Sequence, residues 1–387
     1  QINLQVKDIF NQSSVVSLAE FLSQKPSKKS YIDNLLPSKI KINNTKYHGQ
    51  DILLTGATGY VGIHILKYLL ENTNFKINII IRSEPRLIKL FKFYFNQDIS
   101  KYQNRIKIFV ANITSEKLGL TEKEYQTIKN NSNCIINCAA NVKHYGKMAD
   151  FKDINVTLVS NLLELAASND MVYNQLSTIS VSGLGLCRQT KQNVIFNEWS
   201  LDIGQIIEDN VYIQTKYAAE LLTKQYEQAG LKVNIFRLGN IVERLSDQKF
   251  QINAASNGFQ TRVEAIKKLG VITDEIFNMS VDLSYVDKVA EAIVKILLMK
   301  QYGTYHLYNF KETRFGDYLL NKGIPFKIVD KNNFQNIIKT NNDPAVAVLK
   351  LYLNDFSKNK YDNINVDSNH TIEILKKLNF DWRVYEK

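Results

Sequence analysis

The chain has few cysteines, few prolines and no long apolar run. Only three cysteines occur in 387 residues, and two of them, Cys134 and Cys138, lie in an apolar segment typical of a buried strand, where a disulfide or metal site would be poorly placed. No segment reaches the roughly 20 apolar residues that span a bilayer. Residues 1–10 lack the basic, apolar and small-residue order of a signal peptide. We therefore expect structural thiols, no bound metal, no membrane partner and a cytoplasmic location.

Basic residues outnumber acidic ones, which gives a formal net charge of +11. Clustered lysines and arginines would attract the phosphates of nucleic acid. Here the lysines are scattered, and the chain has no zinc-finger, RNP or basic-zipper motif. We therefore expect no nucleic-acid partner. The basic excess would serve a phosphorylated cofactor or an acidic protein partner equally well.

From Asp51 onward, short apolar segments alternate with helical patterns. The segments predicted as strands are 52–54, 77–81, 106–110, 134–139, 172–177 and 233–236. Apolar strands separated by helices predict an α/β fold with a parallel sheet covered on both faces, and right-handed crossovers make it a doubly wound sheet of the Rossmann type. After about residue 240 the alternation loosens, apart from a return to the sheet near His306. This change predicts a smaller, mainly helical C-terminal substrate domain.

A glycine-rich segment follows the first predicted strand and opens the first predicted helix. Its cofactor-binding candidates are Gly56, Thr58, Gly59, Tyr60, Val61 and Gly62. In a dinucleotide-binding turn the first glycine permits the tight turn, the second lets backbone approach the pyrophosphate, and the third lets the helix pack closely on the sheet. The N–H groups at the start of the helix then face the diphosphate.

The second predicted strand ends in Arg82, where a protein that prefers NAD usually carries an acidic residue. A guanidinium suits a 2′-phosphate instead, and Arg86 supplies a second charge, so we expect NADPH as the cofactor. Further candidates follow the third and fourth strands, where adenine is commonly contacted and where small residues let backbone approach the cofactor. They are Asn112, Ile113, Ala139, Ala140 and Asn141.

The candidate catalytic residues are Thr178, Tyr212 and Lys216. Positions four apart share one face of a helix, so Tyr212 and Lys216 project to the same side. A phenol with a pKa of about 10 is a poor proton donor and acceptor at neutral pH unless a nearby cation stabilises the phenolate. Lys216 would supply that cation and hold the nicotinamide ribose, and Thr178 would donate a hydrogen bond to the substrate oxygen.

These motifs resemble the extended short-chain dehydrogenases/reductases, and more closely the thioester reductase (R) domains that end non-ribosomal peptide synthetases. The resemblance spans most of residues 50–310 and rests on segments 54–62, 137–146, 155–156, 177–181, 212–216 and 237–240. It implies catalysis by Thr178, Tyr212 and Lys216, and it adds Leu238 and Gly239 to the cofactor-binding residues. The sequence departs from the family where Leu238 replaces a common proline and where the segment after Arg82 is short.

The resemblance also suggests how the chain is organised. Residues 1–24 resemble the end of a peptidyl carrier domain without its phosphopantetheine-bearing segment, although any amphipathic helix would show the same periodicity. A linker at 25–49 leads to an NADP-binding Rossmann domain at 50–245, to which 282–310 return. Residues 246–281 and 311–387 would then form the substrate-binding subdomain.

Together these expectations indicate an NADPH-dependent reductase that releases a peptidyl or aminoacyl thioester from the phosphopantetheine of a carrier domain. The product would be an aldehyde, and a second hydride would give an alcohol. Two alternatives remain at this stage. A nucleotide-sugar epimerase or dehydratase would use tightly held NAD, and a non-catalytic NADP-binding sensor would not need the Tyr212 and Lys216 pair.

Overall fold

The structure is a computed structural model that describes residues 40–43, 49–143, 147–183, 193–207, 210–253, 257–341, 343, 346 and 364–382. The predicted carrier remnant at 1–24 and most of the linker lie outside these residues. The described chain divides into two compact units. The first comprises the described residues up to Ser177 together with Ile207–Ile235, and the second comprises those in Thr178–Ile206 and from Phe236 onward.

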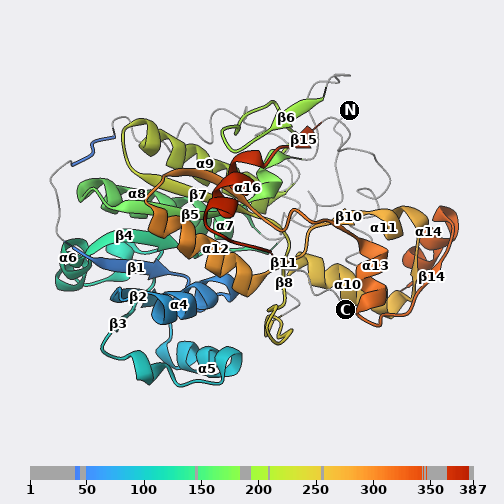
Figure 1. Cartoon of the computed structure of the whole chain (residues 1–387), viewed down its shortest axis with the longest axis horizontal. Coiled ribbons are helices and arrows are strands. Elements are labelled where there is room, and N and C mark those ends of the chain that lie inside the picture. Colours follow the sequence, from blue (N-terminus) through green and yellow to red (C-terminus); the bar gives the residue numbers. More distant parts are fainter. Residues whose placement is uncertain are drawn as a thin grey trace, which may run out of the picture. The chain divides into compact units, whose positions relative to one another are not determined.

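A seven-stranded sheet has the strand order β12-β7-β5-β4-β1-β2-β3. Figure 1 shows β4, β1, β2 and β3 of this sheet next to one another. The strands are β1 (Asp51–Thr55), β2 (Ile77–Ile81), β3 (Ile106–Val110), β4 (Ser132–Asn137), β5 (Val172–Thr178), β7 (Val233–Leu238) and β12 (Gly303–Leu307). β1 to β5 pair in parallel, and the strand order reverses between β1 and β4. The predicted doubly wound Rossmann sheet is confirmed. One strand end is corrected, because β4 stops at Asn137 and not at Ala139.

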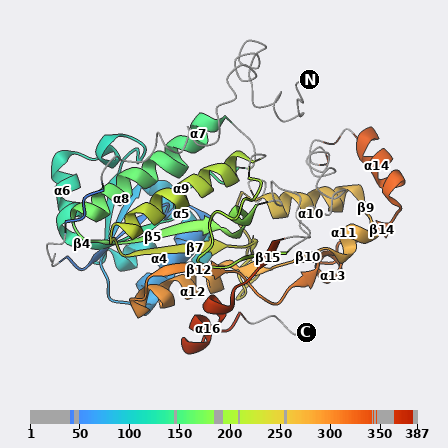
Figure 2. The same ribbon diagram turned by 90° about the horizontal axis from the view of Figure 1, so that it is seen from above.

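Helices cover both faces of this sheet in the first unit. Figure 2 shows α8 (Leu158–Ser168) and α9 (Val211–Gln228) side by side on one face, with α4 (Tyr60–Asn72) on the other. Leu53, Ile135 and Tyr173 are fully buried in one apolar cluster that also includes residues of α8 and α9. α5 (Glu84–Phe95) follows β2, and α6 (Glu122–Asn131) precedes β4. Leu53, Ile135 and Tyr173 therefore pack against the layer that α8 and α9 form, as expected where helices cover a parallel sheet.

Local residue chemistry explains where several helices begin. Ser83 caps α5 by accepting a hydrogen bond from the backbone N–H of Arg86, and Pro85 stands in the first turn. Thr121 and Glu124 form a capping box at the start of α6. Asn210 caps α9 by accepting from two backbone N–H groups of its first turn. Each start is therefore encoded by residues adjacent in the sequence.

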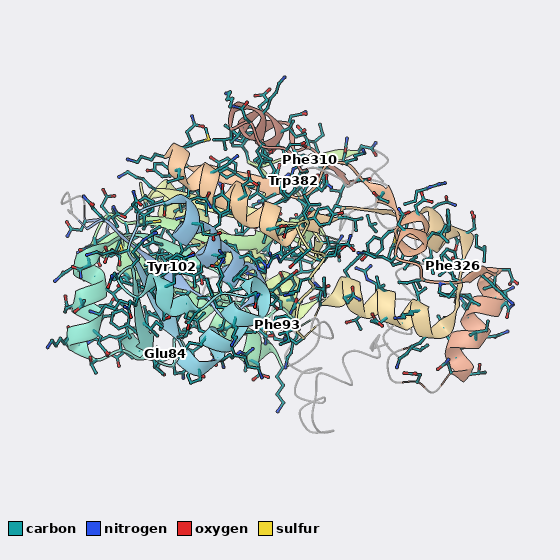
Figure 3. All side chains as sticks on the ribbon, turned by 60° about the horizontal axis from the view of Figure 1, so that its bottom comes forward. Glu84, Phe93, Tyr102, Phe310, Phe326 and Trp382 are labelled. Carbon is teal, nitrogen blue, oxygen red and sulfur yellow. The ribbon has the colours of Figure 1, made fainter. Side chains whose placement is uncertain are left out.

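The second unit is built largely from helices: α10 (Gly258–Leu269), α11 (Asp274–Asn278), α12 (Val286–Met299), α13 (Phe315–Asn321), α14 (Lys331–Thr340) and α16 (Asn369–Lys377). Residues of α10, α11, α13 and α14 share one apolar core. β6 (Val194–Phe196) pairs in parallel with β15 (Ile364–Val366), which ties residues 193–206 to the C-terminal part of the chain. Figure 3 shows Phe310 near Trp382, whose ring lies 6.3 Å away edge to face.

Three small two-stranded pairings complete this unit. They are β10 (Ser280–Val281) with β13 (Thr313–Arg314), β11 (Ser284–Tyr285) with β8 (Ile241–Val242), and β14 (Lys327–Ile328) with β9 (Val271–Ile272). Across both units, no described helix has the length and hydropathy needed to cross a membrane.

Candidate functional site

A cavity of about 220 Å³ lies at the carboxyl ends of β1 to β4 in the first unit. Its lining residues are Gly56, Thr58, Gly59, Ile80, Ile81, Arg82, Arg86, Ala111, Ile113, Cys138, Ala139, Ala140 and Ile154. Open α/β sheets bind ligands beyond the carboxyl ends of their strands, at the point where the strand order reverses. The cavity occupies that point, because β1 and β4 lie on either side of the reversal.

The glycine turn brings two strand ends into contact. Gly56 has a φ of +72°, and a Cβ placed on it would lie 2.5 Å from both the backbone nitrogen of Ala139 and the carbonyl carbon of Cys138. A Cβ on Gly62 would collide with the carbonyl oxygen of Gly56. Only glycine fits these positions, so the turn between β1 and α4 can lie directly against the end of β4.

The first turn of α4 is suited to an anion. Gly59 is the N-cap and offers no side chain to satisfy the free backbone N–H groups that follow it. Gly59 and Thr58 line the cavity, whereas Tyr60, Val61 and Gly62 form the start of the helix and are not among the lining residues. Helix N–H groups and small residues together suit the approach of a pyrophosphate.

Two guanidinium groups line the same cavity. Arg82 directly follows β2, and Arg86 lies in the first turn of α5. Both side chains are exposed, and no carboxylate is present among the lining residues. Ile80, Ile81 and Ile154 also line the cavity, although nothing in their sequence context separates them from ordinary core residues.

The loops after β3 and β4 use their polar side chains locally. The Asn112 amide donates a hydrogen bond to Ser115 Oγ at 3.1 Å, and Asn112 is not among the residues that line the cavity. The backbone N–H of Asn141 donates to Asn155 Oδ1 at 2.7 Å. Asn155 Nδ2 in turn donates to the Asn141 carbonyl and to Thr215 Oγ1, each at 3.0 Å. Asn155 therefore links the loop after β4 to α9, one residue before Lys216.

Asn155 stands on an unusual stretch of backbone. Residues Asp153–Thr157 form a π-helical turn between α7 (Met148–Lys152) and α8. Such turns frequently occur at functional sites. Ile154 of this turn lines the cavity, while Asn155 is buried and holds Asn141 and Thr215.

Lys216 is buried, with 4% of its surface exposed. Its Nζ donates a hydrogen bond to the carbonyl oxygen of Leu176 in β5 at 2.8 Å. Burial lowers the pKa of Lys216 to about 8, while the nearby Glu220 and Cys138 act in the opposite direction. Tyr212 lies one turn earlier on α9, and its backbone N–H is held by Asn210 Oδ1 at 2.9 Å. A lysine with this pKa can change its charge near neutral pH.

Cys138 lines the cavity as a neutral thiol, because burial raises its pKa to about 12. Cys134 is buried in β4, and burial raises its pKa to about 12 as well. Cys187 lies outside the described residues. Among the residues that the structure describes, no group of three or more His, Cys, Asp or Glu side chains could hold a metal ion.

The remaining predicted site residues belong to the second unit. Thr178 is the last residue of β5 and lies two positions after Leu176, whose carbonyl oxygen accepts from Lys216. Thr178 is buried, and its Oγ1 accepts a hydrogen bond from the Ser180 backbone N–H at 3.2 Å. Leu238 ends β7 and is buried. Gly239 lies against Asp282, which accepts a hydrogen bond from the Asn240 backbone N–H at 2.8 Å.

The sequence matches a known family over more than half of its length. The family described as "Male sterility protein" matches residues 54–293. Isonitrile lipopeptide synthase from Streptomyces coeruleorubidus is 28% identical over 198 residues, which cover 49% of this chain and 13% of that protein. A hybrid PKS-NRPS synthetase from Pyrenochaetopsis is 24% identical over 253 residues, covering 61% of this chain and 6% of that protein. The chain thus spans a small fraction of the curated relatives it matches.

Two solved structures share the fold over nearly the whole chain. A thiolation-reductase di-domain from an archaeal non-ribosomal peptide synthetase has a TM-score of 0.80 at 28% identity, covering 98% of this chain and 84% of that chain. The terminal R domain from the myxalamid PKS-NRPS pathway has a TM-score of 0.77 at 22% identity, covering 92% of this chain and 93% of that chain.

Proposed function

We propose that this chain releases a carrier-bound thioester by NADPH-dependent reduction. The chain belongs to the family described as male sterility protein. It is a reductase (R) domain of the extended short-chain dehydrogenase/reductase superfamily. It is an oxidoreductase with a nicotinamide cofactor. The substrate is a peptidyl or aminoacyl group on the phosphopantetheine of a carrier domain, and the first product is an aldehyde. The similarity to a thiolation-reductase di-domain supports the carrier as partner.

The preference for NADPH rests on the two arginines that line the cavity. Arg82 and Arg86 both reach it, and no carboxylate is among its lining residues to bind the ribose hydroxyls of NAD. The glycine turn and the uncapped start of α4 fit the pyrophosphate, and the guanidinium groups fit a 2′-phosphate. When bound, NADPH supplies the hydride that reduces the thioester carbonyl.

Three side chains of this chain would carry the remaining chemistry. Thr178 donates a hydrogen bond to the substrate carbonyl oxygen, which holds that oxygen as negative charge develops on it. Tyr212 donates the proton to the same oxygen. Lys216 would lower the energy of the resulting phenolate and would hold the nicotinamide ribose. The thiol of the phosphopantetheine arm then leaves the hemithioacetal to give the aldehyde.

The alternatives fit the site less well. An NAD-dependent epimerase or dehydratase has no use for two guanidinium groups that line the cavity. A non-catalytic sensor has no use for a lysine held in the interior with a lowered pKa, because burying such a group costs free energy. The single observation that carries the proposal is that the glycine turn, Arg82 and Arg86 line one cavity, in a chain of the reductase family.

The proposed carrier partner is tested by steady-state kinetics with one acyl group presented in two ways. The acyl group is attached to a phosphopantetheinylated carrier domain or to free pantetheine, and NADPH consumption is followed at low and at physiological salt. Because a docking surface raises the local concentration of the arm, kcat/KM should be higher for the carrier-bound form. An equal or lower kcat/KM at both salt concentrations defeats the carrier assignment and leaves the reductase assignment standing.

A further inference from the structure

A buried carboxylate lies one helical turn beyond Lys216. Glu220 is fully buried on α9, and its Oε1 accepts a hydrogen bond from the hydroxyl of Ser177. Lys216, on the same helix as Glu220, donates a hydrogen bond to the carbonyl oxygen of Leu176, the residue before Ser177 in β5. Two side chains of α9 thus hold two successive residues at the end of β5, immediately before Thr178.

The negative charge of Glu220 acts on Lys216 in addition to the packing of α9 against β5. Burial disfavours the protonated form of Lys216 and lowers its pKa to about 8, and the negative charge of Glu220 is the larger of the two opposing influences. The second is Cys138 at the end of β4. Since burial raises the pKa of Cys138 to about 12, its thiol is neutral near neutral pH. Of these two groups, Glu220 is therefore the one whose charge favours the lysine cation.

We propose that Glu220 is a positioning residue for the reductase chemistry: its carboxylate keeps Lys216 in the cationic form that Tyr212 requires. The link to Ser177 holds that carboxylate in place against the end of β5. The inference rests on the proposed function in one respect, namely that Lys216 stabilises the Tyr212 phenolate. The effect of Glu220 on the charge of Lys216 does not depend on that function.

The test compares the pH dependence of kcat, measured as NADPH oxidation with an acyl-pantetheine thioester, in the intact chain and in Glu220→Gln. An opposite charge nearby raises the pKa of a lysine by about one unit or more. The descending alkaline limb of Glu220→Gln should therefore begin about one unit lower than in the wild type. With a wild-type pKa of about 8, the charged fraction at that pH falls about fivefold, and it changes little near pH 6.

Matched variants separate charge from hydrogen bonding. Ser177→Ala breaks the same bond between β5 and α9 but retains the carboxylate, so its alkaline limb should stay close to that of the wild type. Glu227→Gln removes a partly exposed carboxylate from the same helix, where it pairs with Lys224, and should leave the profile unchanged. If Glu220→Gln does not fold, Glu220→Asp replaces it in the test. Its alkaline limb should shift in the same direction as that expected for Glu220→Gln, but by a smaller amount. A purely structural role predicts equal losses at every pH, and the same losses in Ser177→Ala.

A second measurement does not require turnover. Proteins carrying ¹³C at the lysine Cε are titrated by NMR, and the Lys216→Arg variant identifies the Lys216 signal. The Lys216 pKa should be lower in Glu220→Gln than in the wild type and in Glu227→Gln. An unchanged Lys216 titration in a folded Glu220→Gln protein overturns the inference. An inactive wild type that shows the expected NMR shift overturns the proposed function alone.

Discussion

Replacing Gly56 by alanine should weaken NADPH binding at least tenfold, because it adds to the strain of the turn a collision with backbone that lines the cavity. The φ of +72° costs a residue with a side chain roughly 1–2 kcal/mol. The added methyl would also lie 2.5 Å from backbone atoms of Cys138 and Ala139. Carbon atoms pack at about 3.5–4 Å, so the turn or the end of β4 must move by about 1 Å.

That displacement falls on the proposed cofactor site, since Gly56, Cys138 and Ala139 all line the cavity. A tenfold loss of affinity corresponds to about 1.4 kcal/mol. Isothermal titration calorimetry with NADPH gives the Kd, and circular dichroism reports whether the variant is folded.

Gly270→Ala is the matched control for backbone strain. Gly270 has a φ of +68° at the end of α10, and its added Cβ would meet no atom of the described residues within 4 Å. This variant bears the conformational cost without the collision, so its Kd for NADPH should remain within about twofold of the wild-type value. A folded Gly56→Ala protein that binds NADPH as tightly as Gly270→Ala would refute the role of the glycine turn.

Three further predictions concern the catalytic and cofactor residues. Tyr212→Phe should lower kcat by about a hundredfold or more while NADPH affinity stays near the wild-type value, because only the proton donor is lost; near-normal turnover would exclude Tyr212 from catalysis. Arg82→Ala should raise the Kd for NADPH about tenfold and change the Kd for NADH little, as measured by calorimetry; equal losses would show that another group discriminates the cofactors. In the wild type, kcat should fall as pH rises through about 8, because burial lowers the Lys216 pKa and the neutral amine no longer stabilises the phenolate; a flat profile through that range would argue against this role.

Residues chosen for their chemical type were accessible from the sequence. The glycine turn, Arg82, Arg86 and the small residues after β4 line one cavity, because backbone approach requires glycine or alanine and phosphate binding requires charge. The alternation of strands and helices likewise predicted the doubly wound sheet, which depends on a regular apolar period.

Features that depend on long-range packing were not accessible. Ile80, Ile81 and Ile154 line the cavity, but in the sequence they look like any buried isoleucine. Residues 193–206 lie with the C-terminal part of the chain because β6 pairs with β15, and this contact between distant segments leaves no local period. Glu220 is not among the site residues predicted from the sequence, because its relation to Ser177 and Lys216 depends on the packing of α9 against β5.

The most direct test of the central claim is to follow deuterium from NADPH into product. NADPH labelled with deuterium at C4 of the nicotinamide is mixed with the protein and an acyl-phosphopantetheine thioester, and the released compound is identified by mass spectrometry. We expect an aldehyde, or the alcohol derived from it, that carries deuterium on the former thioester carbon, together with a stoichiometric free thiol. Release of the free acid without deuterium, or no consumption of NADPH with any acyl thioester offered, would contradict the account.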